Sequence, residues 1–120
     1  MSTTATKGLA NRQCASCEGG VPPLSGEEVK RYLTEVPEWN LSADGKRIRR
    51  EWRVKDFLAG LDFFNRIAKL AEQEDHHPDL HLTGYRYLAI AISTHSIGGL
   101  SENDFILAAK IDKLPVELKK

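Results

Sequence analysis

The side chains best suited to chemistry in this chain are its four histidines, which all fall between residues 76 and 95: His76, His77, His81 and His95. Imidazole is the only side chain whose unperturbed pKa lies close to neutral pH, so a cluster of imidazoles indicates proton transfer or metal binding. Two of the four stand next to each other between Asp75 and Pro78. The proline ends any helix before it and predicts a loop there, which has no evident structural need for two imidazoles.

Three kinds of chemistry compete for these side chains. A metal site could use the imidazoles with Asp75 or Asp79, but neighbouring side chains in an extended segment point in opposite directions and rarely bind one ion. Nucleophilic catalysis would need a cysteine or an activated serine, and neither is evident in the periodic part of the sequence. General acid/base catalysis needs only groups with a pKa near the working pH, and the pKa of imidazole is about 6.5. The sequence therefore favours acid/base chemistry with no metal and no other cofactor.

The elements before the histidines begin with a helix and a hairpin. Ser25 and Glu28 form a capping box at the start of a helix with apolar residues at Val29, Tyr32, Leu33 and Val36. After Pro37, residues 38–42 and 47–54 flank Ala43-Asp44-Gly45, a turn that is typical of antiparallel strands. Alternation in the second strand predicts that Trp52 faces the core.

The segment that leads into the histidine loop is a long amphipathic helix over residues 56–74. Its predicted buried stripe is Phe57, Leu61, Phe64, Ala68 and Ala71, and the apolar residues that widen it are Phe63, Ile67 and Leu70. An apolar arc this wide predicts burial on more than one side, by the sheet and by a second subunit.

The elements after the loop are two further strands and a last helix. Residues 80–82 and 85–94 read as strands, and Ser101 with Asp104 caps a helix that is apolar at Phe105, Ala108, Ala109 and Ile111. The predicted order is helix, two strands, helix, two strands, helix. This order predicts an α+β fold, with a single four-stranded antiparallel sheet and the helices packed on one face.

The first residues differ in composition from the rest. Residues 1–23 are predicted to be a flexible N-terminal leader, and residues 24–120 the folded domain. The leader holds both cysteines, Cys14 and Cys17, in a CxxC spacing that suits half of a zinc site or a redox pair. No second CxxC completes a tetrahedral site, so reduced thiols are expected.

Charge and hydropathy exclude several classes of function. The 120 residues include 17 basic and 17 acidic side chains, so there is no charge surplus for general nucleic-acid or membrane binding. No apolar run approaches the roughly 20 residues that span a bilayer, and a secretory signal is not evident. A cytoplasmic protein with a small-molecule substrate is expected.

The order and spacing of several residues resembles the pterin-4a-carbinolamine dehydratase family. The residues that carry this resemblance are Glu72, His76-His77-Pro78, Tyr85, His95 and Asp104. Further landmarks are Lys55-Asp56-Phe57, Ser93-Thr94-His95 and Gly99-Leu100-Ser101, so the resemblance covers residues 24–114. It implies a dehydratase (hydro-lyase) that converts 4a-hydroxytetrahydropterin into quinonoid dihydropterin, in the regeneration of tetrahydropterin after aromatic amino acid hydroxylation.

The resemblance also implies roles for individual residues. His76, His77 and His95 are the expected catalytic residues, with His76 and His95 as the acid/base pair and His77 mainly in substrate positioning. Substrate contacts are expected from these histidines and from their neighbours Asp75, Ser93, Thr94 and Ser96. Glu72, Tyr85 and Asp104 are expected to support the site, although Asp104 has an equal claim to be a helix cap. His81 lies outside the pattern and is interpreted as a rim residue.

The family resemblance leaves two points open. Residues 79–84 differ from the animal members and are similar to a microbial and plant-like branch, which leaves the pocket wall undefined. The family also includes non-catalytic dimerisation or assembly-factor modules of the same fold, and three histidines at catalytic spacing argue for the enzyme. Members of the family form homodimers or homotetramers, and a homo-oligomer is expected here.

Overall fold

The computed structural model describes residues 8–12, 14 and 22–120. Within them the helices are η1 (Leu9–Asn11, a 3₁₀ turn), α2 (Gly26–Leu33), α3 (Phe57–Glu74), η2 (His95–Ile97, also 3₁₀) and α4 (Glu102–Asp112). The strands are β1 (Asn40–Leu41), β2 (Ile48–Arg53), β3 (Asp79–Thr83) and β4 (Tyr87–Ile92). The predicted order of helices and strands is confirmed.

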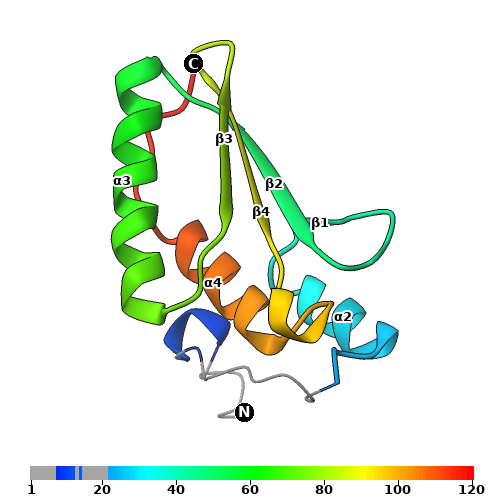
Figure 1. Ribbon diagram of the computed structural model, residues 1–120. Helices are drawn as coiled ribbons and strands as arrows, with labels where there is room; N and C mark the ends of the chain where they lie inside the picture. Colours follow the sequence, from blue (N-terminus) through cyan, green and yellow to red (C-terminus); the bar gives the residue numbers. More distant parts are fainter. Residues whose placement is uncertain (1–7, 13, 15–21) are drawn as a thin grey trace.

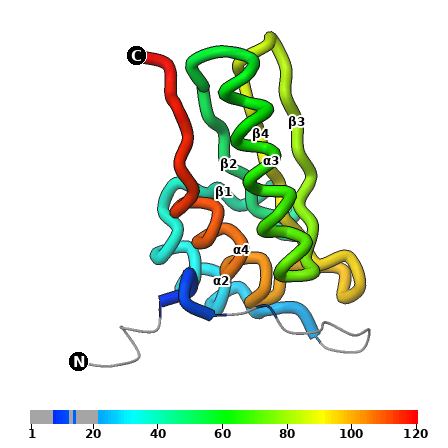
Figure 2. The backbone as a smooth tube through the Cα atoms, turned by 90° about the vertical axis from the view of Figure 1, so that its left-hand side faces the viewer, coloured from blue at the N-terminus to red at the C-terminus, as the bar shows by residue number. Residues whose placement is uncertain are grey.

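The strands form one antiparallel sheet in the order β1-β2-β4-β3 (Figure 1). Ile48 pairs with Ile92 and Trp52 with Leu88, and these side chains are buried beneath the helices. In Figure 2, α3 and α4 lie in front of the strands, which places them on one face of the sheet. The predicted α+β class is therefore confirmed.

Local signals in the sequence account for the ends of the elements. Glu28 N donates to Ser25 Oγ, and Ser25 N donates to Glu28 Oε1, so the predicted capping box starts α2. Asp56 caps α3 by accepting from Ala59 N at 2.8 Å. Asp44 Oδ1 and Gly45, whose φ is +71°, hold the turn between β1 and β2. Each of these contacts joins residues only a few positions apart, which is why the sequence predicts them.

Three aromatic rings form the part of the core that joins the hairpin to α3. The rings of Trp39 and Trp52 meet edge to face with their centroids 5.8 Å apart, and the centroids of Trp52 and Phe63 are 5.3 Å apart. Trp39 Nε1 donates to Asp112 Oδ1 at 2.9 Å, which satisfies the buried indole N–H. The prediction that Trp52 faces the core is confirmed.

The buried stripe of α3 differs from the predicted one. The side chains that α3 buries are Ala59, Gly60, Phe63, Ile67 and Ala71. Phe57 and Leu61, which were expected in the centre of the stripe, are 48% and 40% exposed. Gly60 lets this face of α3 pack closely on β4, because a Cβ at this position would lie only 3.3 Å from Leu88 Cδ2.

The described part of the N-terminal segment packs against the domain. Leu9 is 2% exposed within the hydrophobic core, and η1 lies beside α4 (Figure 1). Arg12 forms an ion pair with Glu102 of α4. The boundary at residue 24 and the flexibility of the leader stay predictions, but residues 8–12 and 14 do not lie apart from the domain. Cys17 falls outside the described residues.

Leu9→Ala tests whether this packing stabilises the fold. Removal of a buried leucine side chain is expected to lower the free energy of unfolding by roughly 2 to 5 kcal/mol, because lost burial and a cavity both contribute. Urea denaturation measures the change. Leu41→Ala is the matched control, since Leu41 is 43% exposed and should change stability by less than about 1 kcal/mol. Equal effects of the two substitutions would show that Leu9 is not part of the folded core.

Among the described residues, the helices are all too short or too polar to cross a membrane.

Candidate active site

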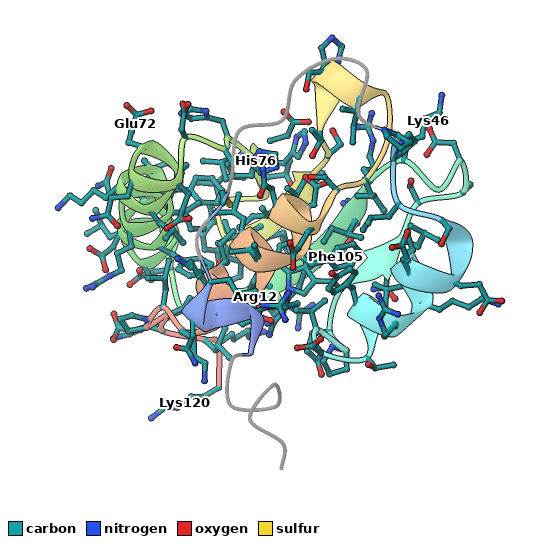
Figure 3. All side chains as sticks on the ribbon, turned by 90° about the horizontal axis from the view of Figure 1, so that it is seen from below. Arg12, Lys46, Glu72, His76, Phe105 and Lys120 are labelled. Atoms are coloured by element: carbon teal, nitrogen blue, oxygen red, sulfur yellow. The ribbon has the colours of Figure 1, made fainter. Side chains whose placement is uncertain are left out.

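His76 is positioned by the end of α3. Asp75 adopts the left-handed conformation, with φ of 52°, and its N–H and that of His76 both donate to Ala71 O. The chain therefore leaves the helix abruptly, and the His76 side chain turns towards α4 (Figure 3). His76 Nε2 lies 2.6 Å from Asp104 Oδ1, and the side chain is 11% exposed. The ring is thus largely buried, and Asp104 holds its Nε2.

Asp104 joins the histidine loop to the end of β4. Its Oδ2 accepts from Ser101 N at 2.8 Å and from Thr94 Oγ1 at 2.9 Å, while Oδ1 contacts His76. The carboxyl group is fully buried. The sequence left open whether Asp104 caps α4 or supports the site; the structure shows the cap and a contact with His76, and the supporting role stays a prediction.

His95 begins η2, directly after the last strand. Thr94 N donates to Gly99 O at 3.0 Å, and Gly98 N donates to His95 O, so the short turn is closed at both ends. A pocket of about 250 Å³ opens here, lined by Lys46, Arg47, Ser93, Thr94, His95, Gly98 and Gly99. His95 is exposed, and its place on this pocket wall makes it accessible to a ligand.

His77 points to the surface, where it pairs with Glu72. Its Nε2 lies 2.6 Å from Glu72 Oε2, and the two side chains are 56% and 78% exposed. Glu72 projects outward from the last turn of α3 in Figure 3. The Glu72 carboxylate contacts the His77 imidazole, and its supporting role stays a prediction. Asp75, the C-cap of α3, is also exposed.

Two predicted site residues lie differently from the expectation. Tyr85 sits in the turn between β3 and β4, at the opposite end of the sheet from the loop after α3 (Figure 1). It is 58% exposed and stacks with Arg86, so within this chain it is not part of the histidine cluster. Thr94 is 4% exposed, and its hydroxyl is engaged by Asp104 and Ser101. The hydroxyl of Thr94 therefore positions other side chains, although Thr94 also lines the pocket beside His95.

The other residues that were predicted to contact substrate stay predictions, and the structure gives only their positions. Ser93 lines the same pocket as His95, and Ser96 is an exposed residue of η2. His81 is exposed on β3.

Lys46 and Arg47 line the pocket and were not predicted. The register of β2 against β4 explains the position of Arg47: because Ile48 pairs with Ile92, the preceding residue Arg47 lies beside Ser93.

Cys14 lies between the end of α3 and the start of α4, and its thiol is not reactive at neutral pH. Its N–H donates to Glu74 Oε1 at 2.8 Å, and its thiol donates to Asn103 O. Burial, and then the negative charge of Glu74, raise the pKa of Cys14 to about 12. Burial alone would raise the pKa of Glu74, but the Cys14 N–H and the Lys110 ammonium group, 2.7 Å away, lower it below the usual value. At neutral pH the thiol is therefore protonated and is a poor nucleophile.

The described residues do not bring three or more histidine, cysteine, aspartate or glutamate side chains together in a metal-binding arrangement. What the cluster offers instead is one hydrogen-bonded imidazole, one exposed imidazole on a pocket wall, and a buried carboxylate that links their segments. Such a set can move protons to and from a bound ligand.

Comparison with known proteins gives a consistent result. Residues 22–114 match the family described as pterin 4 alpha carbinolamine dehydratase. The chain is 47% identical over 106 residues to a Halorhodospira halophila protein provisionally named for this activity, covering 88% of this chain and 96% of that protein. It is also 47% identical over 112 residues to the mitochondrial pterin-4-alpha-carbinolamine dehydratase 2 of Arabidopsis thaliana, covering 91% of this chain and 60% of the plant protein.

The fold has a solved counterpart as well. A crystal structure of a transcriptional coactivator/pterin dehydratase from Brucella melitensis superposes with a TM-score of 0.70 at 29% identity, over 75% of this chain and 95% of that one. Sequence and fold therefore agree, and this chain belongs to the pterin-4a-carbinolamine dehydratase family.

Proposed function

We propose that this protein removes water from a 4a-hydroxytetrahydropterin to give the quinonoid dihydropterin, with histidines as general acid and base. The observation that carries the proposal is the chain of hydrogen bonds from His76 through Asp104 to Thr94. It ties the loop after α3 to the segment that holds His95, although the two histidines are nineteen positions apart in the sequence. In our proposal a flat ligand in the pocket beside His95 also meets the imidazole of His76, whose segment these hydrogen bonds tie to the pocket residue Thr94.

The reaction needs two proton transfers and no change in oxidation state. The proton on ring nitrogen N5 is removed, the electron pair of the N–H bond forms the C4a=N5 double bond, and the C4a–oxygen bond breaks. The hydroxyl group accepts a proton and leaves as water. One base and one acid therefore complete the step, and no metal ion or redox cofactor is required.

The bond to Asp104 assigns a role to each nitrogen of His76. Our proposal takes Asp104 as a carboxylate, which only accepts hydrogen bonds, and His76 as a neutral ring, so that Nε2 carries the ring proton and Nδ1 keeps a free lone pair. In our proposal Nδ1 of His76 takes the N5 proton, and the exposed His95, which exchanges protons readily with water, protonates the leaving hydroxyl. His77, oriented by Glu72, positions the ring, and Asp75, Ser93 and Ser96 are available to bind its polar edge.

Stopped-flow absorbance of carbinolamine breakdown tests the function. The wild-type protein is expected to accelerate the loss of water well above the rate in buffer. If breakdown proceeded at the buffer rate, the enzyme proposal would fail and a non-catalytic dimerisation or assembly-factor module would be the better account of the fold.

We also propose that the protein is a homo-oligomer in which α3 contributes to the contact. Phe57, Leu58 and Leu61 leave a large apolar surface on this helix, with 48%, 75% and 40% exposure. Analytical ultracentrifugation tests the proposal, because a Leu58→Glu variant should dissociate where the wild type does not. A monomeric wild type would contradict it.

A further inference from the structure

Two basic side chains stand beside the proposed catalytic pocket without a part in the proposed proton transfers. Lys46 and Arg47 lie at the end of the turn between β1 and β2, directly before β2. They line the pocket of about 250 Å³ together with Ser93 and His95. The backbone of the turn is fixed, because Ser42 N donates to Arg47 O, and Asp44 Oδ1 accepts from Lys46 N. The hydrogen bonds of the turn and the register of β2 against β4 thus fix the backbone of both residues beside the pocket.

The positive charge at this edge is only partly balanced. Among the ion pairs that the described residues form, the two side chains do not take part. The nearest carboxylate in the turn belongs to Asp44, which accepts from the Ser42 hydroxyl at 2.6 Å and from Lys46 N at 3.0 Å and does not line the pocket. Two cations on a pocket wall that lacks a lining carboxylate favour a negatively charged ligand.

The chemistry of the reaction places a substituent close to these cations. In a tetrahydropterin, C6 is bonded to N5, and N5 is bonded to the reacting C4a. A side chain on C6 therefore leaves the ring beside the atoms on which His76 and His95 are proposed to act. Lys46 and Arg47 line the same pocket as His95, so a C6 side chain can extend towards them.

We propose that Lys46 and Arg47 form a subsite for an anionic group on the C6 side chain, so that the preferred pterin carries a phosphate or a carboxylate. The inference rests on the proposed function, since it assumes that a pterin binds beside His95. Arg47 suits either group, because guanidinium binds phosphate and carboxylate through paired hydrogen bonds, while Lys46 adds a point charge.

Titration calorimetry with matched ligands tests the subsite. The ligands are a 7,8-dihydropterin with a neutral trihydroxypropyl side chain, the same compound phosphorylated on its terminal hydroxyl, and dihydrofolate, whose side chain ends in carboxylates. The phosphorylated compound is expected to bind roughly tenfold more tightly than its neutral counterpart, the gain of charge-assisted bonds at a partly exposed site. Comparison with dihydrofolate tells phosphate from carboxylate preference. Raising the salt concentration should shrink the difference.

The double variant Lys46→Gln/Arg47→Gln is expected to bring the ratio of the two affinities close to one. Lys30→Gln/Lys69→Gln is the matched control, because it removes two exposed cations that do not line the pocket and should keep the wild-type ratio. Equal binding of charged and neutral ligands, or a ratio that the first variant retains, would overturn the subsite and leave the proposed function standing. Binding of none of the ligands would overturn the subsite, and the stopped-flow assay would then decide separately whether the proposed function also fails.

Discussion

Replacing His76 or His95 with alanine is expected to slow the dehydration of a 4a-hydroxytetrahydropterin by roughly 10²- to 10⁴-fold, the range that a positioned acid or base contributes. Each imidazole is proposed to serve one of the two proton transfers, so loss of either should lower kcat. The double variant should lose less than the product of the two single effects, because residues that act as a unit are not additive. Stopped-flow absorbance at several pH values measures these rates.

His81→Ala is the control for the loss of an imidazole. His81 is exposed on β3 and lies outside the cluster, so this variant should keep the wild-type rate. The free energy of unfolding distinguishes the His76→Ala variant from the His95→Ala variant. His76→Ala leaves the buried Oδ1 of Asp104 without its partner and should lower the free energy of unfolding by roughly 1 to 3 kcal/mol, whereas His95→Ala should change it little. Wild-type rates in both catalytic variants would refute the assignment.

The features that the sequence predicted correctly are those set by local contacts. The capping boxes at Ser25 and Ser101 and the turn at Gly45 join residues three or fewer positions apart. Such contacts depend on neighbouring residues and not on tertiary packing, so residue types and spacing are enough to identify them. The sequence indicated that the loop with His76 and the segment with His95 meet, but only through the family resemblance. The residues around either histidine do not by themselves predict contact with the other segment.

The features that the sequence did not predict depend on tertiary packing. Helical periodicity marks a wide apolar arc on α3 but cannot say which part of it faces the sheet, and the close approach at Gly60 decides this. Composition predicted a loose leader, yet Leu9 fills a place in the core. Thr94 was expected to bind substrate because it stands next to His95. The structure adds a contact that the sequence did not predict, because the Thr94 hydroxyl donates to Asp104, which only the fold brings within reach.

Asp104→Asn is expected to lower kcat by roughly 10²-fold or more, because it reverses the hydrogen-bond pattern that holds His76. The backbone N–H of Ser101 can only donate, so the amide oxygen must occupy the position of Oδ2. The amide NH₂ then faces His76 Nε2, which has to accept, and the ring proton moves to Nδ1. The nitrogen proposed to take the N5 proton would thereby become a donor, although the side chain keeps its size and its place.

Asp112→Asn on the same helix separates this effect from a loss of stability. Asp112 also accepts hydrogen bonds, from Trp39 Nε1 and from Arg50, but it is at the end of α4 away from the histidines. Both variants should lose roughly 1 to 3 kcal/mol of unfolding free energy, as expected when a charged acceptor is removed from its donors. Only Asp104→Asn should lose kcat and change the pH profile. If Asp104→Asn lost stability alone, Asp104 would be a helix cap and the proposed direction of proton transfer at His76 would have to be abandoned.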